Sequence, residues 1–306
     1  MKRRLNIEVL IKSFVLFLAL ILPMASPVLA DSRKELIGER TEYTKKFDNG
    51  DRTITFQVSS SPLHYQDDAG TWQDIDLDVT NIGEPDYELG VLKNKFKTRF
   101  GRHANQPTRF DFKGAWVQFK PEGSKNVPGV AAGSTVTYQG AWEGADLRYK
   151  VGAEELKEEI VLQAPGAVTR FRFHFVAHGV SARQEADGSI GFYLADGIKS
   201  FTMPAPFMYD SAQQPVSSDA VKYELTQQGN GFYLDIAPDQ AWLAAPERVY
   251  PVIVDPTISV NTAGGNVGRA TFNVAYGQTV SWYCNVPIFL IVNDTGLNVF
   301  QDRDKL

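Results

Sequence analysis

The stretch VTRFRFHFVA, residues Val168–Ala177, decides the fold class of this 306-residue chain. Phenylalanine occupies every second position from Phe171 to Phe175, and Arg172 and His174 occupy the positions between. Successive side chains of a β-strand point to opposite faces of its sheet. The pattern therefore predicts a strand with one face in a hydrophobic core and the other in water.

Shorter alternating segments recur along the chain, separated by turn pairs such as Asn49-Gly50 and Asp187-Gly188. They lie at residues 53–58, 147–151, 190–194, 221–225 and 232–236. The best helix candidate, Ala153–Glu159, runs directly into the apolar segment Ile160–Leu162. Many short alternating strands with Gly, Asp and Asn turns predict an all-β protein, an antiparallel β-sandwich in one unit or in two lobes.

The N-terminus has the three features of a signal peptide. Basic residues stand at positions 2–4, an apolar run extends from Phe14 to Leu22, and Val28-Leu29-Ala30 offers a cleavage site. The alternative is an uncleaved amphipathic or membrane helix, but the run is shorter than the roughly 20 residues that a bilayer requires. We predict a cleaved signal peptide at residues 1–30, a β-sandwich region at residues 31–258, and secretion to the exterior or the cell wall.

Charge and cysteine content limit the classes of partner and cofactor. Residues 1–30 carry four basic residues and one acidic residue, so cleavage changes the net charge of the chain from −5 to −8. A negative surface repels phosphate backbones, which predicts no nucleic-acid partner, and it does not attract anionic wall polymers either. Cys284 is the only cysteine, so neither an internal disulfide nor a cysteine metal site can form. We predict no cofactor and, after cleavage, no membrane partner.

The usual signatures of hydrolases are weak. No Gly-x-Ser-x-Gly elbow is present. His174 and His178 are four residues apart, which on a strand is about 13 Å, too far to share one small ion. The acidic run Glu154–Glu159 is interspersed with lysine and is typical of a solvated edge or turn.

Two further groups of residues could bind a ligand. Asp74, Asp76 and Asp78 alternate with apolar residues and would line the outer face of a strand, either as a plain polar face or as oxygen ligands for calcium. Four tryptophans of the β-sandwich region are candidates for stacking on sugars, although core packing is the favoured account of most of them; they are Trp72, Trp116, Trp142 and Trp242.

Several strings, in this order, resemble the N-terminal region of large secreted Gram-positive proteins, namely wall-associated, YD-repeat (Rhs-like) and DNRLRE-domain-containing proteins. The strings are FDNG (47–50), SPLHYQD (61–67), WQDID (72–76), NKFK (94–97), GADLRY (144–149), LKEEIVL (156–162), PAP (204–206) and YPVIVDPTI (250–258). The resemblance implies a β-rich leader region ahead of other modules, with no catalytic residues to carry over.

The sequence then predicts a function without catalysis. We expect a secreted cell-envelope module that acts as scaffold, adhesion or delivery leader region, not as an enzyme. The alternative is an envelope glycan-binding module, or a glycan hydrolase or lyase with two carboxylates in one cleft. Partners would be a cell-wall polymer or the downstream modules of a longer protein.

The region after Pro256 changes in character. Residues 261–268 are rich in glycine and asparagine, as linkers are, and an apolar run follows at Val286–Val292. We expect residues 259–306 to be a linker-like tail that packs poorly against the β-sandwich region, in a chain that a truncated gene could encode.

Overall fold

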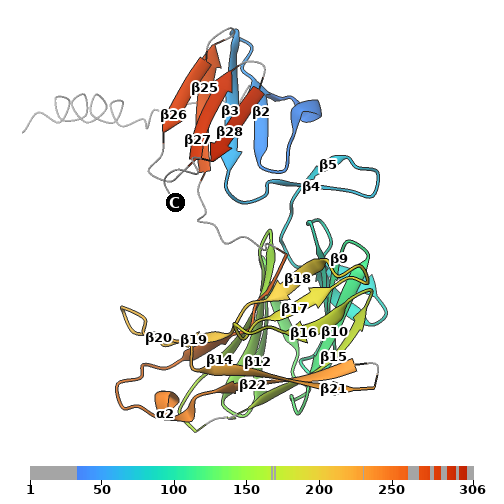
Figure 1. Ribbon diagram of the computed structural model, residues 1–306, viewed down its shortest axis with the longest axis vertical. Coiled ribbons are helices and arrows are strands. Elements are labelled where there is room, and N and C mark those ends of the chain that lie inside the picture. Colours follow the sequence, from blue (N-terminus) through green and yellow to red (C-terminus); the bar gives the residue numbers. More distant parts are fainter. Residues whose placement is uncertain are drawn as a thin grey trace, which may run out of the picture.

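The computed structural model of the protein describes residues 33–260, except 167, 169 and 230, and the backbone of four later strands (Figure 1). The predicted signal peptide at residues 1–30 and Cys284 lie outside the described residues. The described regular structure is almost entirely strand, and its helices are the single turns η1 (Ile37–Glu39) and α2 (Gln240–Leu243). Within the described residues, no helix has the length and apolar character needed to cross a membrane.

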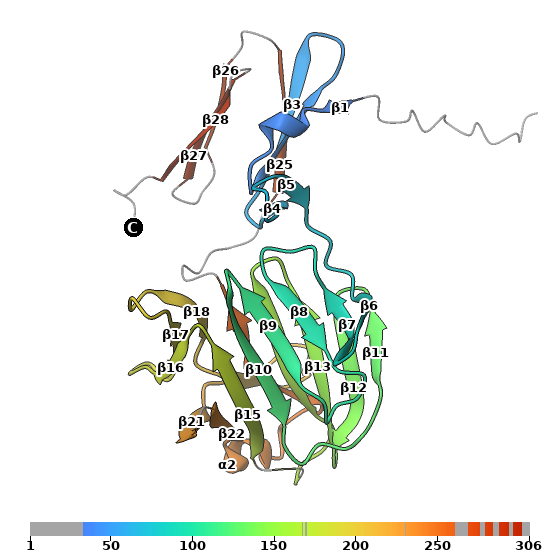
Figure 2. The same ribbon diagram turned by 90° about the vertical axis from the view of Figure 1, so that its right-hand side faces the viewer.

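The first large sheet has eight antiparallel strands. Figure 2 shows β7, β8, β9, β10 and β15 of this sheet side by side. In spatial order the strands are β21 (Val221–Gln228), β22 (Gly231–Pro238), β15 (Phe171–His178), β10 (Ala115–Pro121), β9 (Thr108–Phe112), β8 (Lys97–Phe100), β7 (Tyr87–Val91) and β6 (Thr80–Glu84).

The second large sheet has eleven strands, and it faces the first. Its main path is β11 (Gly129–Ala132), β12 (Thr135–Trp142), β13 (Ala145–Val151), β14 (Glu155–Leu162), β24 (Ile258–Ser259), β18 (Lys199–Met203), β17 (Ile190–Tyr193) and β16 (Ser181–Gln184). A side branch adds β23 (Val252–Asp255), which pairs with β14, then β19 (Phe207–Tyr209) and β20 (Ser217–Ser218).

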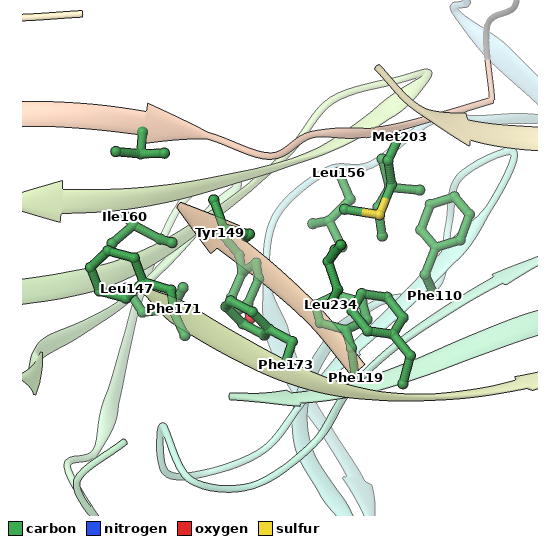
Figure 3. Packing of buried hydrophobic residues seen from close by; sticks show 14 of the residues in the cluster. Phe110, Phe119, Leu147, Tyr149, Leu156, Ile160, Phe171, Phe173, Met203 and Leu234 are labelled. Atoms are coloured by element: carbon green, nitrogen blue, oxygen red, sulfur yellow. The ribbon is translucent and has the colours of Figure 1, made fainter. Parts of the chain in front are cut away.

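One hydrophobic core lies between the two large sheets. Figure 3 shows side chains from both sheets, among them Phe119, Phe173 and Tyr149, packed together in this core. The decisive strand β15 behaves as its sequence predicts, because Phe171, Phe173 and Phe175 are buried while Arg172 is exposed. The predicted all-β antiparallel sandwich is confirmed.

A small four-stranded sheet stands apart from the sandwich. Its order is β1 (Lys34–Glu35), β2 (Thr44–Asp48), β3 (Thr53–Ser59) and β25 (Arg269–Ala275), so a strand from the predicted tail pairs with β3. Three further strands of the tail form a sheet of their own, β26 (Thr279–Tyr283), β27 (Ile288–Asn293) and β28 (Gly296–Gln301). The short hairpin of β4 (His64–Gln66) and β5 (Trp72–Asp74) lies between the small sheet and the sandwich in both views (Figures 1 and 2).

The acidic run at residues 154–159 differs from its prediction as a solvated edge or a helix candidate. Residues 155–162 form β14, which pairs with β13 on one side and with β23 and β24 on the other. Glu158 and Glu159 are buried, with 3% and 6% of their surface exposed. The prediction was wrong because lysines and glutamates together suggest a surface, whereas here strands on both sides enclose the segment.

Candidate functional site

A groove of about 540 Å³ is the site with the most ligand-like chemistry in the described part of the chain. One wall is the β4–β5 hairpin, and the other is the outer face of β8, β9 and β10. We call it the cationic groove, because five cationic and three acidic side chains line it. These are Lys95, Lys97, Arg99, Arg109 and Lys113, and Asp67, Asp68 and Asp111; Tyr65 and Trp116 add aromatic rings.

Strand register brings these groups together from distant positions. Lys97 on β8 lies opposite Asp111 on β9, and Asp111 lies opposite Trp116 on β10. These residues alternate with the buried Phe96, Phe110 and Phe112 of the core, so they point to the outer face. The alternating pattern of β8 and β9 was a usable signal for a charged face, but the sequence does not show the pairing that joins the two strands.

The two arginines of the groove share one carboxylate. Arg99 Nη1 and Arg109 Nη2 each lie 2.7 Å from an oxygen of Asp111, and Arg99 Nε lies 2.7 Å from Glu84. These hydrogen-bonded pairs hold the guanidinium groups in place and neutralise much of their charge.

Two lysines of the groove keep their charge available. Within the described residues, neither Lys97 nor Lys113 lies in an ion pair, whereas Lys95 Nζ lies 2.5 Å from Glu42. Lys113 occupies the turn between β9 and β10 with a backbone φ of 50°, and its ammonium lies 5.2 Å from the ring centroid of Phe112. Lys97 and Lys113 are therefore the groups of the groove best able to receive an anion.

The indole of Trp116 is half-buried and contacts side chains from both neighbouring strands. The guanidinium carbon of Arg109 lies 4.3 Å from its ring centroid, and the imidazole of His178 stacks on it at 5.4 Å with an interplanar angle of 14°. Arg109 comes from β9 and His178 from β15, the strands that flank β10. A planar ligand that stacked on this ring would therefore compete with these two side chains.

A charged network behind the groove fixes the hairpin wall. Arg40 donates to both carboxylate oxygens of Glu35, at 2.7 and 3.0 Å, and to Asp74 of β5 at 3.0 Å. Lys45 Nζ lies 2.5 Å from the other oxygen of Asp74. The hydrogen bond to Glu35 is the main reason that the pKa of Arg40 is raised above its usual value. The network ties the hairpin to the segment around η1 and to β2.

His64 of β4 lies beneath this network and is fully buried. Burial lowers the pKa of its imidazole, so the ring is neutral near pH 7. Nδ1 lies 2.6 Å from the carbonyl oxygen of Thr41, which can only accept, so Nδ1 donates. His64 therefore anchors the hairpin, and its burial keeps it out of contact with a ligand in the groove.

One of the three acidic side chains of the groove, Asp67, accepts hydrogen bonds within the turn of the β4–β5 hairpin. Asp67 accepts hydrogen bonds from the backbone amides of Ala69 and Thr71 and from Gln73 Nε2. The bond from Thr71 is the main cause that lowers the pKa of Asp67. Asp68, next to it, is exposed.

The four candidate tryptophans occupy four different surroundings. Trp142 is 5% exposed, packs edge-on against Phe171 and Phe173, and donates its indole N–H to a backbone oxygen. Trp242 of α2 packs against the core with Arg248 over its ring, 4.3 Å from the centroid. Trp72 lies on the hairpin strand β5, and Trp116 lies in the cationic groove. The structure does not gather them on one face.

The other candidate groups are also separate. His174 and His178 lie on strand β15, as predicted, with His174 beside Tyr233 and His178 on Trp116. Asp74 pairs with Arg40 and Lys45, and Asp76 faces Lys93 at 3.5 Å. Among the described residues, no group of three or more His, Cys, Asp or Glu side chains could hold a metal ion.

Comparison with known proteins finds relatives that are named as tRNA nucleases of Bacillus and as a wall-associated protein of Geobacillus, each less than 30% identical to this chain. It is 28% identical over 248 residues to the tRNA3(Ser)-specific nuclease WapA of Bacillus spizizenii, an alignment that covers 75% of this chain and 10% of that protein. It is 27% identical over 277 residues to the tRNA nuclease WapA of Bacillus subtilis, covering 84% of this chain and 12% of that protein. No family model matches the chain.

A shorter relative has a different name. The wall-associated protein of Geobacillus stearothermophilus is 25% identical over 197 residues, which is 58% of this chain and 75% of that protein. The chain spans about a tenth of the length of the tRNA nucleases that it matches.

These names correct the function predicted from the sequence. The predicted function was a module without catalysis, with glycan binding or glycan cleavage as the alternative. This function does not agree with relatives named as tRNA nucleases. The prediction that the protein is not an enzyme does not agree with them either. The predicted function was wrong because it was based on the lack of a recognisable catalytic motif in this sequence. The predicted relationship to wall-associated proteins is confirmed, and the chain is similar to proteins associated with the cell wall.

Proposed function

We propose that the protein acts at the cell wall as a nuclease on tRNA. The observation that carries this proposal is the similarity over 75% and 84% of the chain to proteins named as tRNA nucleases. The match to a wall-associated protein supports the location. We also propose that the protein is exported with cleavage of residues 1–30. A relationship to YD-repeat or DNRLRE-domain proteins is part of the same proposal.

The cationic groove supports a function that involves phosphodiesters. Lysine and arginine side chains are the groups that proteins use to hold phosphate oxygens. The described residues provide five such groups in one groove, in a chain whose net charge is −5.

The test of the nuclease activity uses protein purified from the organism that encodes it. The protein is incubated with total tRNA, and the products are separated on a denaturing gel. We expect discrete tRNA fragments that are missing when the same preparation is made from a strain without the gene. tRNA that stays intact with the purified protein would contradict the nuclease proposal.

A further inference from the structure

We infer that the cationic groove binds the phosphodiester chain of an anionic cell-wall polymer. The inference rests on the wall location in the proposed function, and it adds a ligand class and a binding site. The ligand is a polymer with repeating phosphate groups and no bases, of the poly(glycerol phosphate) type.

Local charge favours such a ligand although the whole chain is acidic. Five cationic and three acidic side chains line the groove, while the chain without residues 1–30 has a net charge of −8. Charges within about 10 Å dominate at physiological ionic strength, because salt screens those farther away. A phosphate in the groove therefore experiences mainly Lys97 and Lys113, because nearby carboxylates pair with the other three cations.

The cations of the groove differ in whether a carboxylate pairs with them, and this arrangement suits a ligand with several phosphates. Asp111 holds Arg99 and Arg109, each at 2.7 Å, so these two guanidinium groups form a fixed floor. Lys97 on β8 and Lys113 in the β9–β10 turn lack ion pairs within the described residues and stand at different points of the groove. A ligand with more than one phosphate can contact both lysines at once.

The aromatic side of the groove favours this polymer over RNA. Proteins that bind single-stranded RNA stack its bases on open aromatic faces. A base that stacked on Trp116 would compete with Arg109 and His178, which contact this ring from the two flanking strands. The groove therefore offers contacts to phosphates more readily than stacking to a base.

The comparisons point in the same direction. The region shared with the Geobacillus protein makes up 75% of that protein, whose name refers to the wall and not to a nuclease. The much longer nucleases match 75% and 84% of this chain. The name of the Geobacillus protein, of which the shared part is the larger share, suits a wall ligand for this region.

The experiment measures how the full chain without its signal peptide binds to purified wall sacculi. One sample of sacculi is native, and the other has lost its phosphate polymers by acid extraction; soluble poly(glycerol phosphate) and tRNA serve as competitors. The test variant is Lys97→Gln with Lys113→Gln. The matched control is Lys222→Gln, which removes an exposed lysine of β21 far from the groove in the sheet order.

We expect the double variant to bind native sacculi about tenfold more weakly, since each lysine near a phosphate-rich surface contributes roughly a few-fold to affinity. The control should bind native sacculi as the unchanged chain does. Extracted sacculi should retain neither the control nor the unchanged chain. Asp68→Asn removes an exposed negative charge from the groove and should strengthen binding, a gain that misfolding cannot produce.

Other results would overturn the inference. These are equal binding by the double variant and the unchanged chain, no difference between native and extracted sacculi, or competition by tRNA but not by poly(glycerol phosphate). The proposed function fails separately, because it is contradicted by intact tRNA or by protein that is missing from the wall, whatever the groove variants do.

Discussion

Glu158 and Tyr149 are register partners on β14 and β13, and both side chains lie inside the sandwich. Neither Glu158 Oε1 nor the Tyr149 hydroxyl has a hydrogen-bond partner among the described residues, and the same holds for the Tyr223 hydroxyl. Burial raises the pKa of Glu158 well above its usual value, and the nearby Asp255 raises it further. Burial therefore favours the protonated form of this carboxyl group in the folded protein.

The raised pKa of Glu158 makes the stability of the fold depend on pH. The folded pKa of Glu158 lies above the unfolded one, so its contribution is complete below the unfolded pKa and is lost as pH rises toward the folded value. The loss is at most about 1.4 kcal/mol per pH unit for one proton. We predict that Glu158→Gln, which keeps the shape and cannot ionise, gains stability relative to the unchanged chain as pH rises.

Urea unfolding of both proteins between pH 5 and pH 9 (as rough limits) measures this difference. The two curves should diverge with pH and lie close together at the acidic end. Parallel curves would show that Glu158 is ionised in the folded state or is not enclosed.

Asp235 gives the opposite pH dependence. Its buried carboxylate lies 2.8 and 2.7 Å from two nitrogens of Arg172, and this hydrogen-bonded pair lowers the pKa of Asp235. Its contribution is present above the unfolded pKa and is lost as pH falls through the folded one. Asp235→Asn should cost about 1.5–3 kcal/mol at pH 7 and progressively less below about pH 4, as thermal unfolding can measure. A constant cost at every pH would contradict this assignment.

Replacing Trp142 and Trp116 by alanine should lower the free energy of unfolding by different amounts. Trp142→Ala removes a buried ring that packs against Phe171 and Phe173, so we expect a cost of about 3–5 kcal/mol. Trp116→Ala removes a partly exposed ring and its contact with Arg109, which we expect to cost about 1 kcal/mol. Equal losses in urea unfolding would mean that Trp142 is less enclosed than the structure has it.

The hairpin wall depends on Arg40. Arg40→Met removes the donor that links Glu35 to Asp74, so the hairpin of β4 and β5 should open more often. Hydrogen exchange should become faster at the backbone amides of these two strands and stay unchanged in β15. Unchanged exchange in the hairpin would show that Lys45 and His64 hold it without the arginine.

The sequence predicted the strands themselves better than it predicted which segments pack against them. Alternation in β15 placed its phenylalanines correctly, because period two depends on the strand alone. Glu158 interacts electrostatically with Tyr223, which is 65 residues away in the chain, so its burial could not be read from the acidic run.

The groove escaped prediction for the same physical reason. Lys97, Asp111 and Trp116 lie on three different strands and meet only through the register of β8, β9 and β10. Net charge also misled, since a value summed over the whole chain hides a local excess of lysine and arginine.

Fractionation of the organism that encodes the protein tests the central claim, association with the cell wall, most directly. Wall, membrane, cytoplasm and culture medium are probed with an antibody to the chain, together with a cytoplasmic marker protein. We predict that the protein is found in the wall fraction and is released when the wall is digested. Protein that stays with the cytoplasmic marker, or that digestion of the wall does not release, would contradict the account.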